Sequence, residues 1–481
     1  MGEVQFKKVS DYLWEMPPAG CMTVPGRIYA SDKLMEAVRS EKSQDQVANV
    51  ACLPGIIKYS LAMPDIHWGY GFPIGGVAAF DVQTGIVSPG GVGYDINCGV
   101  RLMRTNLFLK DIQGKIEDIV RHLYSVIPTG VGSSGAIEKI SRAEERELVV
   151  KGARWAVERG YGKSADLKHI EDGGCISLAD PSFISDQALQ RGLAQVGTLG
   201  SGNHFLEIGK VTEIYRPEIA DVFDLQVDQI IMMIHTGSRG FGYQICDDYV
   251  KKLLKAAGRY GINLPDRQLA CAPVNSPEGQ EYLATMACAA NYAWVNRQVI
   301  MALAEKAFAR AMNLSEPQLG LDLIYDVCHN IAKIEEHEVD GQMIKVCVHR
   351  KGATRAFPPH HPLVPADYQE TGQPVLVPGD MGRSSFLCVG TDEAMKQTFG
   401  SSCHGAGRVA SRTQMLKKLK GHNLIQELAE RGVFVMTKTH DSLAEEMPEA
   451  YKDVAEVVDV MEKAGISKKV AKFKPLGVIK G

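Results

Sequence analysis

The residues GGVGYDINCGV, at positions 90–100, close a segment, 53–100, that is rich in glycine and proline and interrupted by short apolar runs such as 76–80. Because apolar and aromatic residues persist throughout, this segment predicts strands joined by site-forming loops rather than a linker. Four glycines in the quoted run surround Asp95 and Cys98, which are three residues apart. Glycine permits positive φ values and lets the backbone approach a ligand closely, so we expect these glycines to clear space beside the carboxylate and the thiol.

Outward from this run, helical and strand patterns are mixed along the chain. Strands are predicted over 204–208, 229–235, 374–378 and 384–390, and a hairpin over 333–349 turns at Asp340-Gly341. A segment almost free of breakers, 278–312, predicts one long helix or two stacked ones; the other predicted helices are 31–50 (capped by Ser31 or Asp32), 110–126, 142–160, 186–195, 405–431 and 448–464. Without a repeat or a linker, the mixture predicts an α+β fold: one compact domain over 1–481, with mixed or antiparallel sheets surrounded by helices.

Composition excludes several classes of protein. The net charge of −4 leaves no overall footprint for nucleic acid, so any such binding must come from a local basic groove. No stretch approaches 18 apolar residues without a charge, so no membrane span is expected, and residues 1–8 lack the apolar core of a secretory signal. Eleven cysteines, an odd number, in a long chain with no secretory signal predict a reducing cytoplasm, with the thiols free or bound to metal.

Four histidines share one kind of position, at the end of a predicted element beside glycine or small polar residues. They are His204, His235, His329 and His404. One such histidine, or one Asp-x-x-Cys turn, is more often a capped or buried structural feature than a ligand. Four together, with Asp95 and Cys98 available, favour a cluster around a borderline metal such as zinc, manganese or iron.

Phosphate binding is the second theme of the sequence. Glycine-rich turns at 130–135, 197–203, 237–240 and 405–407 offer backbone N–H groups, and the last is expected to open a helix whose N-terminus attracts anions. Basic residues accompany these turns or follow the hairpin. The candidate contacts to RNA or another phosphate-rich ligand are Arg191, Arg239, Arg350, Lys351, Arg355, Arg408 and Arg412. A solvated surface loop is the plainer interpretation of the basic segment 349–357.

Taken together, four motifs resemble the RtcB family of RNA-splicing and RNA-repair ligases. They are the run at 90–100 and the segments MPDIHWGYGFPIGG (63–76), GSGNHFLE (200–207) and FGSSCHGAGR (399–408). The similarity extends over almost the whole chain, and the motifs are long and unusual. The resemblance implies the RtcB-type fold.

The resemblance also implies roles for individual residues. The manganese ligands are matched by Asp95, Cys98, His204, His235 and His329, with Cys98 bridging two ions. His404 matches the histidine that attacks the α-phosphate of GTP to form a covalent histidine–GMP intermediate. Guanylate contacts are matched by Asn203, His204, Phe205, Leu206, Glu207, His329, Asn330, Pro378, Gly379, Asp380, Met381, Ser385, His404, Gly405, Ala406, Gly407 and Lys480. Asp380 stands where some family members have a small hydroxyl residue.

The activity implied is the joining of RNA that ends in a 3′-phosphate or 2′,3′-cyclic phosphate to RNA that begins with a 5′-hydroxyl, in tRNA splicing or RNA repair. GTP and two manganese ions would be required, and the accessory protein archease is an expected partner. Two alternatives remain open at this stage. A metal-dependent phosphohydrolase would use the same ligands without a nucleophilic His404, and a non-catalytic RNA-binding protein would not need Cys98.

Overall fold

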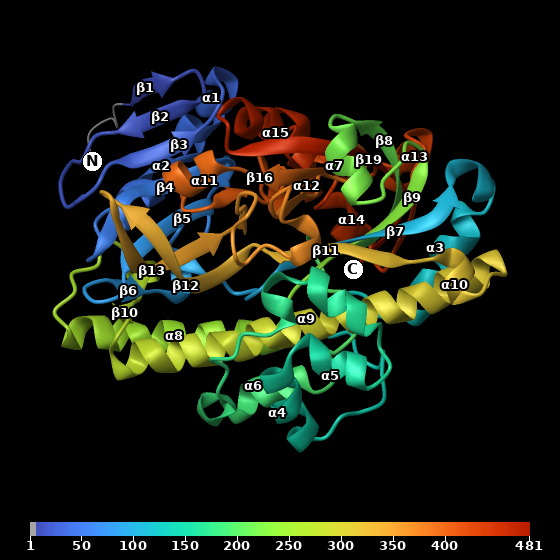
Figure 1. The fold of residues 1–481 in the computed structure, drawn as a ribbon, viewed down its shortest axis with the longest axis horizontal. Coiled ribbons are helices and arrows are strands. Elements are labelled where there is room, and N and C mark those ends of the chain that lie inside the picture. Colours follow the sequence, from blue (N-terminus) through green and yellow to red (C-terminus); the bar gives the residue numbers. More distant parts are fainter. Residues whose placement is uncertain (1–5) are drawn as a thin grey trace.

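The computed structural model describes residues 6–481, and two large sheets form its framework (Figure 1). The first has 7 strands in the order β1 (Lys7–Ser10), β2 (Leu13–Met16), β3 (Gly26–Tyr29), β4 (Ile56–His67), β5 (Ile74–Asp81), β13 (Gln342–Lys351) and β12 (Asn330–Val339). The second has 8, in the order β11 (Asp322–Cys328), β7 (Gly99–Phe108), β9 (Gln229–Thr236), β8 (Phe205–Ile214), β19 (Ser467–Lys480), β16 (Ser385–Gly390) and β15 (Pro374–Val377), with β18 (Phe434–Thr437) beside β19.

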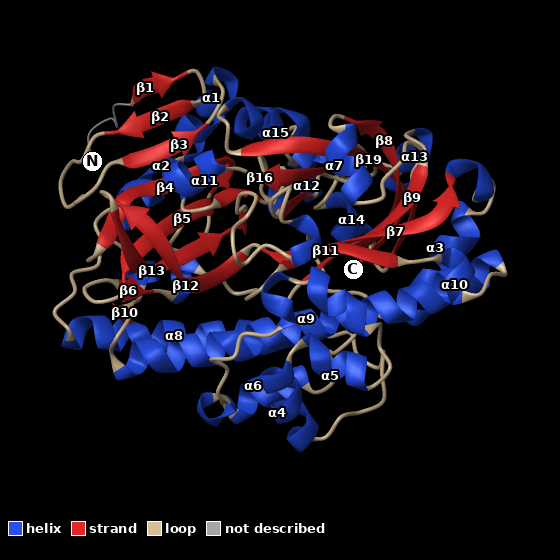
Figure 2. Cartoon of the chain, viewed as in Figure 1, coloured by secondary structure: helices blue, strands red, loops and turns tan. Residues whose placement is uncertain are grey.

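The pairing within both sheets is mostly antiparallel. Only β3–β4 and β18–β19 are parallel pairs among the described strands. Two short ribbons complete the strands, β6 (Ile86–Val87) with β10 (Ala272–Pro273) and β14 (Ala353–Arg355) with β17 (Ser401–Cys403). Helices surround the sheets (Figure 2), so the predicted α+β class with mixed sheets is confirmed.

One long helix, α9 (Pro277–Met312), runs beneath the sheets in the view of Figure 1. The side chain of Ser276 caps its N-terminus by accepting a hydrogen bond from the backbone N–H of Gly279. Most of its residues are buried because sheets and helices cover it on all sides. The helices packed around it are α3 (Ile116–Val126), α4 (Arg142–Lys151), α5 (Ala153–Glu158), α8 (Arg239–Arg259) and α10 (Glu316–Leu319).

Several predicted helices are interrupted. Residues 31–50 form α1 (Asp32–Glu41) and α2 (Ser43–Val50), which are separated by Lys42 at φ 59°. Gly152, also at positive φ, divides 142–160 into α4 and α5. The remaining helices are α6 (Asp186–Gly192), α7 (Pro217–Val222), α11 (Asp392–Thr398), α12 (Arg412–Lys418), α13 (Leu424–Glu430), α14 (His440–Ala444) and α15 (Val454–Lys463). Because α12 begins only at Arg412, the expectation that 405–407 opens a helix is wrong.

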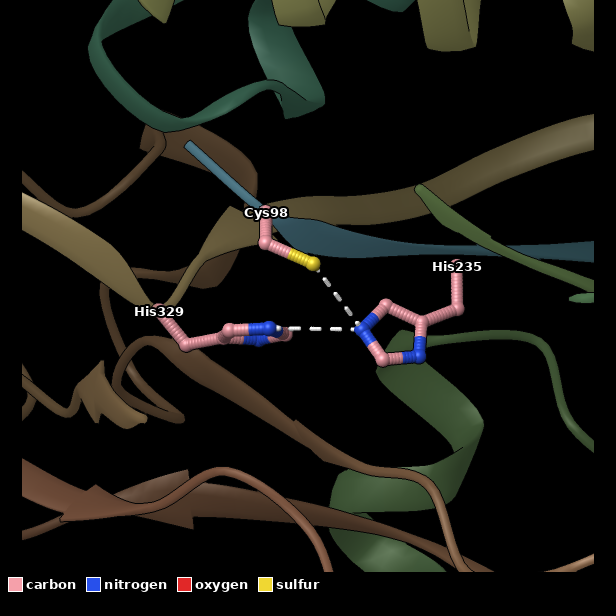
Figure 3. A group of neighbouring side chains, drawn as sticks. All are labelled: Cys98, His235 and His329. Carbon is pink, nitrogen blue, oxygen red and sulfur yellow. Dashed lines mark hydrogen bonds between the residues drawn. The ribbon is translucent and has the colours of Figure 1, made fainter. Parts of the chain in front are cut away.

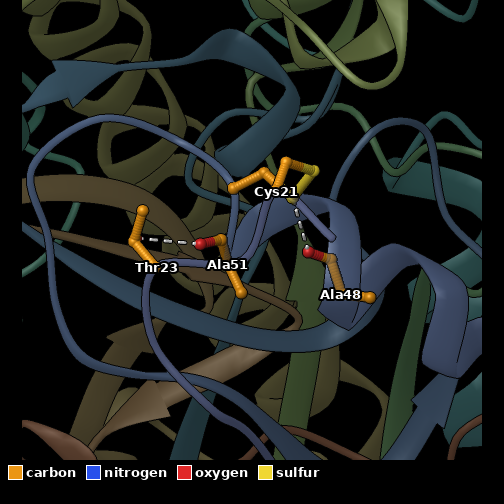
Figure 4. Close-up of a disulfide and its surroundings, with 5 residues drawn as sticks. Cys21, Thr23, Ala48 and Ala51 are labelled. Atoms are coloured by element: carbon orange, nitrogen blue, oxygen red, sulfur yellow. Dashed lines mark hydrogen bonds between the residues drawn. A yellow bond between two sulfur atoms is a disulfide. The ribbon is translucent and has the colours of Figure 1, made fainter. Parts of the chain in front are cut away.

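Cys21 and Cys52 form a disulfide that joins the segment before β3 to the end of α2 (Figure 4). Their Cα atoms lie 5.1 Å apart, within the normal range for a disulfide. Thr23 reinforces the junction, since its backbone N–H and its hydroxyl both donate to the carbonyl of Ala51. The prediction that every thiol is free or bound to metal is therefore wrong for this pair, which lies 31 residues apart in a sequence that gives no signal for it. The other nine cysteines are free.

Within the described residues, no helix combines the length and the apolar character needed to cross a bilayer. The prediction about a secretory signal concerns residues 1–8, of which 1–5 lie outside the described part of the chain.

Because most neighbouring strands of the second sheet are antiparallel, the start of one strand lies beside the end of the next along one edge of the sheet. Gly99 at the start of β7 pairs with Cys328 at the end of β11 and with Thr236 at the end of β9. Phe205 at the start of β8 pairs with His235 and with Lys480 at the end of β19. Segments that are far apart in the sequence thus deliver their terminal side chains to the same place.

Candidate active site and metal centre

A cavity of 720 Å³ opens at this edge, and residues from both sheets line it. His67 and Lys351 come from β4 and β13 of the first sheet, whereas Phe205 and His235 come from β8 and β9 of the second. All five candidate metal ligands and His404 line the same cavity. The structure therefore gathers into one place the residues that the sequence singled out for chemistry.

Two groups of candidate metal ligands share Cys98. The first contains Cys98, His235 and His329 (Figure 3), and the second contains Asp95, Cys98 and His204; within each group the ligand atoms lie within 4.8 Å of one another. The Cys98 sulfur lies 3.3 Å from Nε2 of His235 and 3.5 Å from Nε2 of His204. Nε2 of His235 lies 3.3 Å from Nε2 of His329. The Cys98 sulfur is thus the donor atom that the two groups have in common.

The protonation of these groups suits metal binding. Burial, reinforced by nearby positive charge, lowers the pKa of His235 and His329 well below the usual range, so both imidazoles are neutral at pH 7. Burial alone would raise the pKa of Asp95, but the His204 imidazole lowers it overall. Burial and the Asp95 charge raise the pKa of the Cys98 thiol, which a bound cation would ionise. A carboxylate, a thiolate and three imidazoles fit a borderline divalent metal.

Arg297, on α9, holds the backbone on both sides of this centre. Its guanidinium donates to the carbonyls of Asn97 at 2.9 Å and Thr236 at 2.8 Å, the neighbours of Cys98 and His235, and to the side chain of Asn97 at 2.9 Å. The charge is balanced by Asp326, to which Arg297 donates at 2.8 and 2.9 Å. Arg297 and Asp326 are both fully buried. Residues outside the ligand shell orient metal ligands in proteins through such hydrogen bonds. Arg297 therefore supports the candidate metal centre.

The glycines of the run at 90–100 mostly serve protein packing rather than ligand access. A side chain at Gly90 would lie 2.5 Å from the carbonyl oxygen of Gln268, and one at Gly99 would lie 2.5 Å from that of Val327. Gly93, at φ +98°, lines the cavity. The expectation that all four clear space for a ligand is therefore wrong. The closest approach to a candidate ligand is that of Gly200, where a Cβ would lie 2.1 Å from Nδ1 of His204; at Gly237 it would lie 2.5 Å from the carboxylate oxygens of Asp95.

His404 follows β17 and is held by Asp65 of β4. Oδ2 of Asp65 accepts hydrogen bonds from Nδ1 of His404 at 2.6 Å and from the backbone N–H groups of His404 at 2.9 Å and Gly405 at 3.2 Å. Burial alone would raise the pKa of Asp65, but the charge and hydrogen bonds of His404 bring it below its usual value. The imidazole lies against His329, with ring centroids 4.8 Å apart. With Nδ1 donating to a carboxylate, Nε2 keeps its lone pair.

Most of the predicted guanylate contacts line the cavity, and two do not. Leu206 points away from it into the core because alternate residues of β8 face opposite sides, which leaves Phe205 and Glu207 facing the cavity. Ser385 contacts a residue of the cavity wall instead: its hydroxyl oxygen accepts a hydrogen bond from the backbone N–H of Gly379 at 3.1 Å. The residues that do line it are Asn203, His204, Phe205, Glu207, His329, Asn330, Pro378, Gly379, Asp380, Met381, His404, Gly405, Ala406, Gly407 and Lys480.

The predicted RNA contacts fall into three groups: residues that line the cavity, one residue beside it, and two residues buried in ion pairs. Arg239, Lys351, Arg408 and Arg412 line the cavity, and Arg191 lies nearby with its guanidinium over the ring of Tyr243.

Arg350 and Arg355, in contrast, are 0% and 1% exposed. Arg350 donates to Glu335 at 2.6 and 2.8 Å, and Arg355 donates to Asp172 at 2.9 Å. Both guanidinium groups thus form ion pairs inside the protein, as buried charges require. The prediction that these two arginines contact RNA is contradicted by their placement.

Known proteins match the chain along most of its length. The family model of the tRNA-splicing ligase RtcB matches residues 46–481. The chain belongs to the RtcB family. It is 53% identical over 477 residues to the tRNA-splicing ligase RtcB of Archaeoglobus fulgidus, an alignment that covers 99% of this chain and 98% of that protein.

Two further relatives show the breadth of the RtcB family. The tRNA-splicing ligase RtcB of Methanococcus maripaludis is 52% identical over 476 residues, covering 98% of this chain and 99% of its own. The RNA-splicing ligase RtcB of Mycobacterium tuberculosis is 51% identical over 438 residues, covering 91% of this chain and all of its own. The resemblance drawn from the four sequence motifs is therefore confirmed.

Two residues of this RtcB site were missed by the sequence reasoning. Asp65 lies inside the motif at 63–76, but nothing in the sequence alone pairs it with His404, which is 339 positions away. Arg297 carries a visible signal, because it is the one charged residue between Glu281 and Glu305 in an otherwise uncharged segment. A charge inside a buried helix implies a buried partner. Arg297 has such a partner in Asp326, and it also supports the metal centre.

Proposed function

We propose that this RtcB-family ligase joins RNA ending in a 3′-phosphate or 2′,3′-cyclic phosphate to RNA beginning with a 5′-hydroxyl, through a covalent histidine–GMP intermediate on His404. The observation that carries the proposal is the placement of His404: its Nδ1 is held by Asp65 at 2.6 Å while its ring lies against His329, one of the candidate metal ligands. A nucleophile oriented by a carboxylate beside a metal centre is suited to nucleotidyl transfer.

In the guanylylation step, Nε2 of His404 would attack the α-phosphate of GTP. The new bond joins nitrogen to phosphorus, and pyrophosphate leaves with the electrons of the broken phosphoanhydride bond. Asp65 contributes by fixing the tautomer, since its carboxylate accepts a hydrogen bond from Nδ1–H and leaves Nε2 free. It also stabilises the positive charge that the imidazole acquires in the attack.

Asp95, Cys98, His204, His235 and His329 would hold two manganese ions, with Cys98 shared between them. When bound, such ions neutralise charge on the triphosphate and on the RNA ends. The choice of manganese over zinc or iron rests on the resemblance to the family. The protein's own part is to keep the imidazoles neutral through burial and to fix the ligand backbone through Arg297.

The charged and hydrogen-bonding groups of the cavity support the proposal that GTP binds there. Lys480 and Arg408 supply positive charge on its wall, and Glu207 and Asp380 supply oxygen atoms that accept or donate hydrogen bonds. Burial raises the pKa of Glu207 to about 8 and lowers that of Lys480 to about 8. The preference for guanine over other bases is inferred from the family alone.

The later steps follow from the same site. Where the RNA ends in a cyclic phosphate, water opens it to a 3′-phosphate before GMP is transferred. GMP then passes from His404 to that phosphate as the nitrogen–phosphorus bond breaks, and the 5′-hydroxyl of the second RNA attacks the activated phosphate with GMP as the leaving group. Arg239 and Arg412 on the cavity wall are the proposed contacts to RNA phosphates. Lys351 is only 5% exposed, and its Nζ donates to the carbonyls of Tyr70, Phe72 and Gly90, so we do not propose it as an RNA contact. We further propose a cytoplasmic role in tRNA splicing or RNA repair, with archease as an activator.

A ligation assay tests this proposal. Purified protein, with GTP, manganese and archease, is given one RNA with a 3′-phosphate and one with a 5′-hydroxyl. We expect a joined product that disappears without GTP and in His404→Ala. A phosphohydrolase would instead release inorganic phosphate without GTP, and a non-catalytic RNA-binding protein would retain RNA equally well in Cys98→Ala without joining it; either result would overturn the proposal.

A further inference from the structure

Three tyrosines form an aromatic cluster on the cavity wall, next to the metal centre. Tyr94 directly precedes the candidate ligand Asp95. Its ring meets the edge of Tyr70, with centroids 5.4 Å apart and planes at 71°, and stacks on Tyr243, with centroids 4.7 Å apart and planes at 29°. All three rings line the cavity. We call Tyr70, Tyr94 and Tyr243 the tyrosine stack.

Core packing does not account for the outer member of the tyrosine stack. Tyr243 is 49% exposed, and it projects from the second turn of α8, two residues after Phe241, which is fully buried. The guanidinium of the exposed Arg191, from α6, lies 5.9 Å from its ring centre. A tyrosine that stays about half exposed beside an exposed arginine presents both groups that single-stranded nucleic acid requires: an aromatic ring for a base and a charge for a phosphate.

We propose that the tyrosine stack receives a nucleobase of a single-stranded RNA end on the ring of Tyr243, with Arg191 facing the RNA backbone. This inference rests on the proposed function and adds to it a base-stacking subsite. Tyr94 connects the subsite to the reaction, because the same short loop carries Asp95 and Cys98. A base held here would fix the end of the RNA relative to the metal centre and so raise the fraction of bound RNA that is correctly oriented.

The base can belong to either of the two RNA ends, and the chemistry of stacking is the same for both. Stacking tolerates any base, since each has an aromatic face. The subsite therefore predicts little sequence preference but a requirement for an unpaired, intact base. Removing that base from the RNA should have the same effect as removing the ring from the protein.

The test measures KM for each RNA end separately, in wild type, Tyr243→Ala, Tyr243→Phe and Tyr260→Ala. Tyr260 is a matched control, because it lies at the other end of α8, is 44% exposed and lies outside the cavity. Each RNA is also made with an abasic nucleotide at the positions nearest its reactive end. We expect Tyr243→Ala to raise KM about tenfold for one of the two RNAs, Tyr243→Phe to restore it, and Tyr260→Ala to match wild type. The abasic RNA should raise KM for wild type by a similar factor and remove the difference between wild type and Tyr243→Ala.

Three results would overturn the inference. One is an unchanged KM for both RNAs in Tyr243→Ala, and another is an effect that is equally large on abasic RNA. The third is loss of the GTP-derived label on His404 in Tyr243→Ala, which would place the ring in the GTP site or in the fold.

Failure of the proposed function is distinguishable from failure of this inference. If wild type neither takes up label from GTP nor joins RNA, the proposed function fails. The binding of the same fluorescently labelled RNAs, measured by anisotropy, then tests the tyrosine stack alone: weaker binding by Tyr243→Ala that depends on the base supports it, and equal binding overturns it.

Discussion

Replacing Arg297 with methionine is expected to weaken metal binding without touching a metal ligand. The substitution keeps most of the side-chain volume but removes five hydrogen bonds, two to Asp326 and three to Asn97 and Thr236. The residues next to Cys98 and His235 thereby lose their common support. Loss of such supporting contacts typically lowers metal affinity about 10–100-fold.

The same change should lower the free energy of unfolding by about 3–5 kcal/mol, the usual effect of breaking a buried ion pair from one side. Asp326 retains one partner, Arg101, whose Nε donates to it at 2.7 Å, so the lower part of this range is expected. Stability and metal affinity must therefore be separated by a control that loses a comparable buried pair elsewhere.

Arg350→Met is that control. Arg350 is fully buried and donates to both oxygens of Glu335 and to Ser401, but it donates to no neighbour of a metal ligand in the structure. Free Mn²⁺ is measured by electron paramagnetic resonance during titration, and stability by urea unfolding. Both variants should lose stability, but only Arg297→Met should lose manganese affinity. Equal affinity in Arg297→Met and Arg350→Met would refute the supporting role of Arg297.

Three other changes give separate tests. Asp65→Asn should slow the labelling of His404 by GTP about 10²–10⁴-fold, because an amide stabilises the wrong imidazole tautomer, and labelling at the wild-type rate would count against that role. Glu145→Gln should raise stability increasingly as the pH rises from about 4.5 to 8. Burial raises the pKa of this fully buried carboxyl to about 8, so in that range the folded chain keeps Glu145 protonated while the unfolded chain releases the proton, which favours unfolding; urea unfolding at a series of pH values that shows a constant difference would contradict this. Reduction of the Cys21–Cys52 disulfide should lower the free energy of unfolding by about 3–4 kcal/mol, as expected for the 31-residue separation, whereas Cys52→Ser should be insensitive to reductant.

Local sequence patterns predicted a large part of the fold. The uninterrupted pattern at 278–312 became α9, and the hairpin turning at Asp340-Gly341 became β12 and β13. Local breaks were harder to place, because left-handed residues such as Lys42 split a helix that the apolar pattern treats as continuous. The helix α8 was not predicted, because its glycines and polar residues weaken the apolar pattern that the packed structure nevertheless buries.

The candidate site was predicted by residue type better than by contact. Asp95, Cys98 and the histidines carry donor atoms whatever their surroundings, so their identity alone suggested a metal. Support for them comes from residues that become neighbours only in three dimensions, such as Asp65 and Arg297. For the same reason the sequence could not separate Arg239, which lines the cavity, from Arg350, which is buried in an ion pair.

The most direct test of the account is to locate the nucleotide on the protein after incubation with GTP and manganese. The protein is digested under conditions that preserve a phosphoramidate bond, and the peptides are sequenced by mass spectrometry. The account predicts a GMP adduct on His404, absent in His404→Ala and strongly reduced in Cys98→Ala. An adduct on any other residue, or joined RNA formed without a nucleotide adduct, would contradict it.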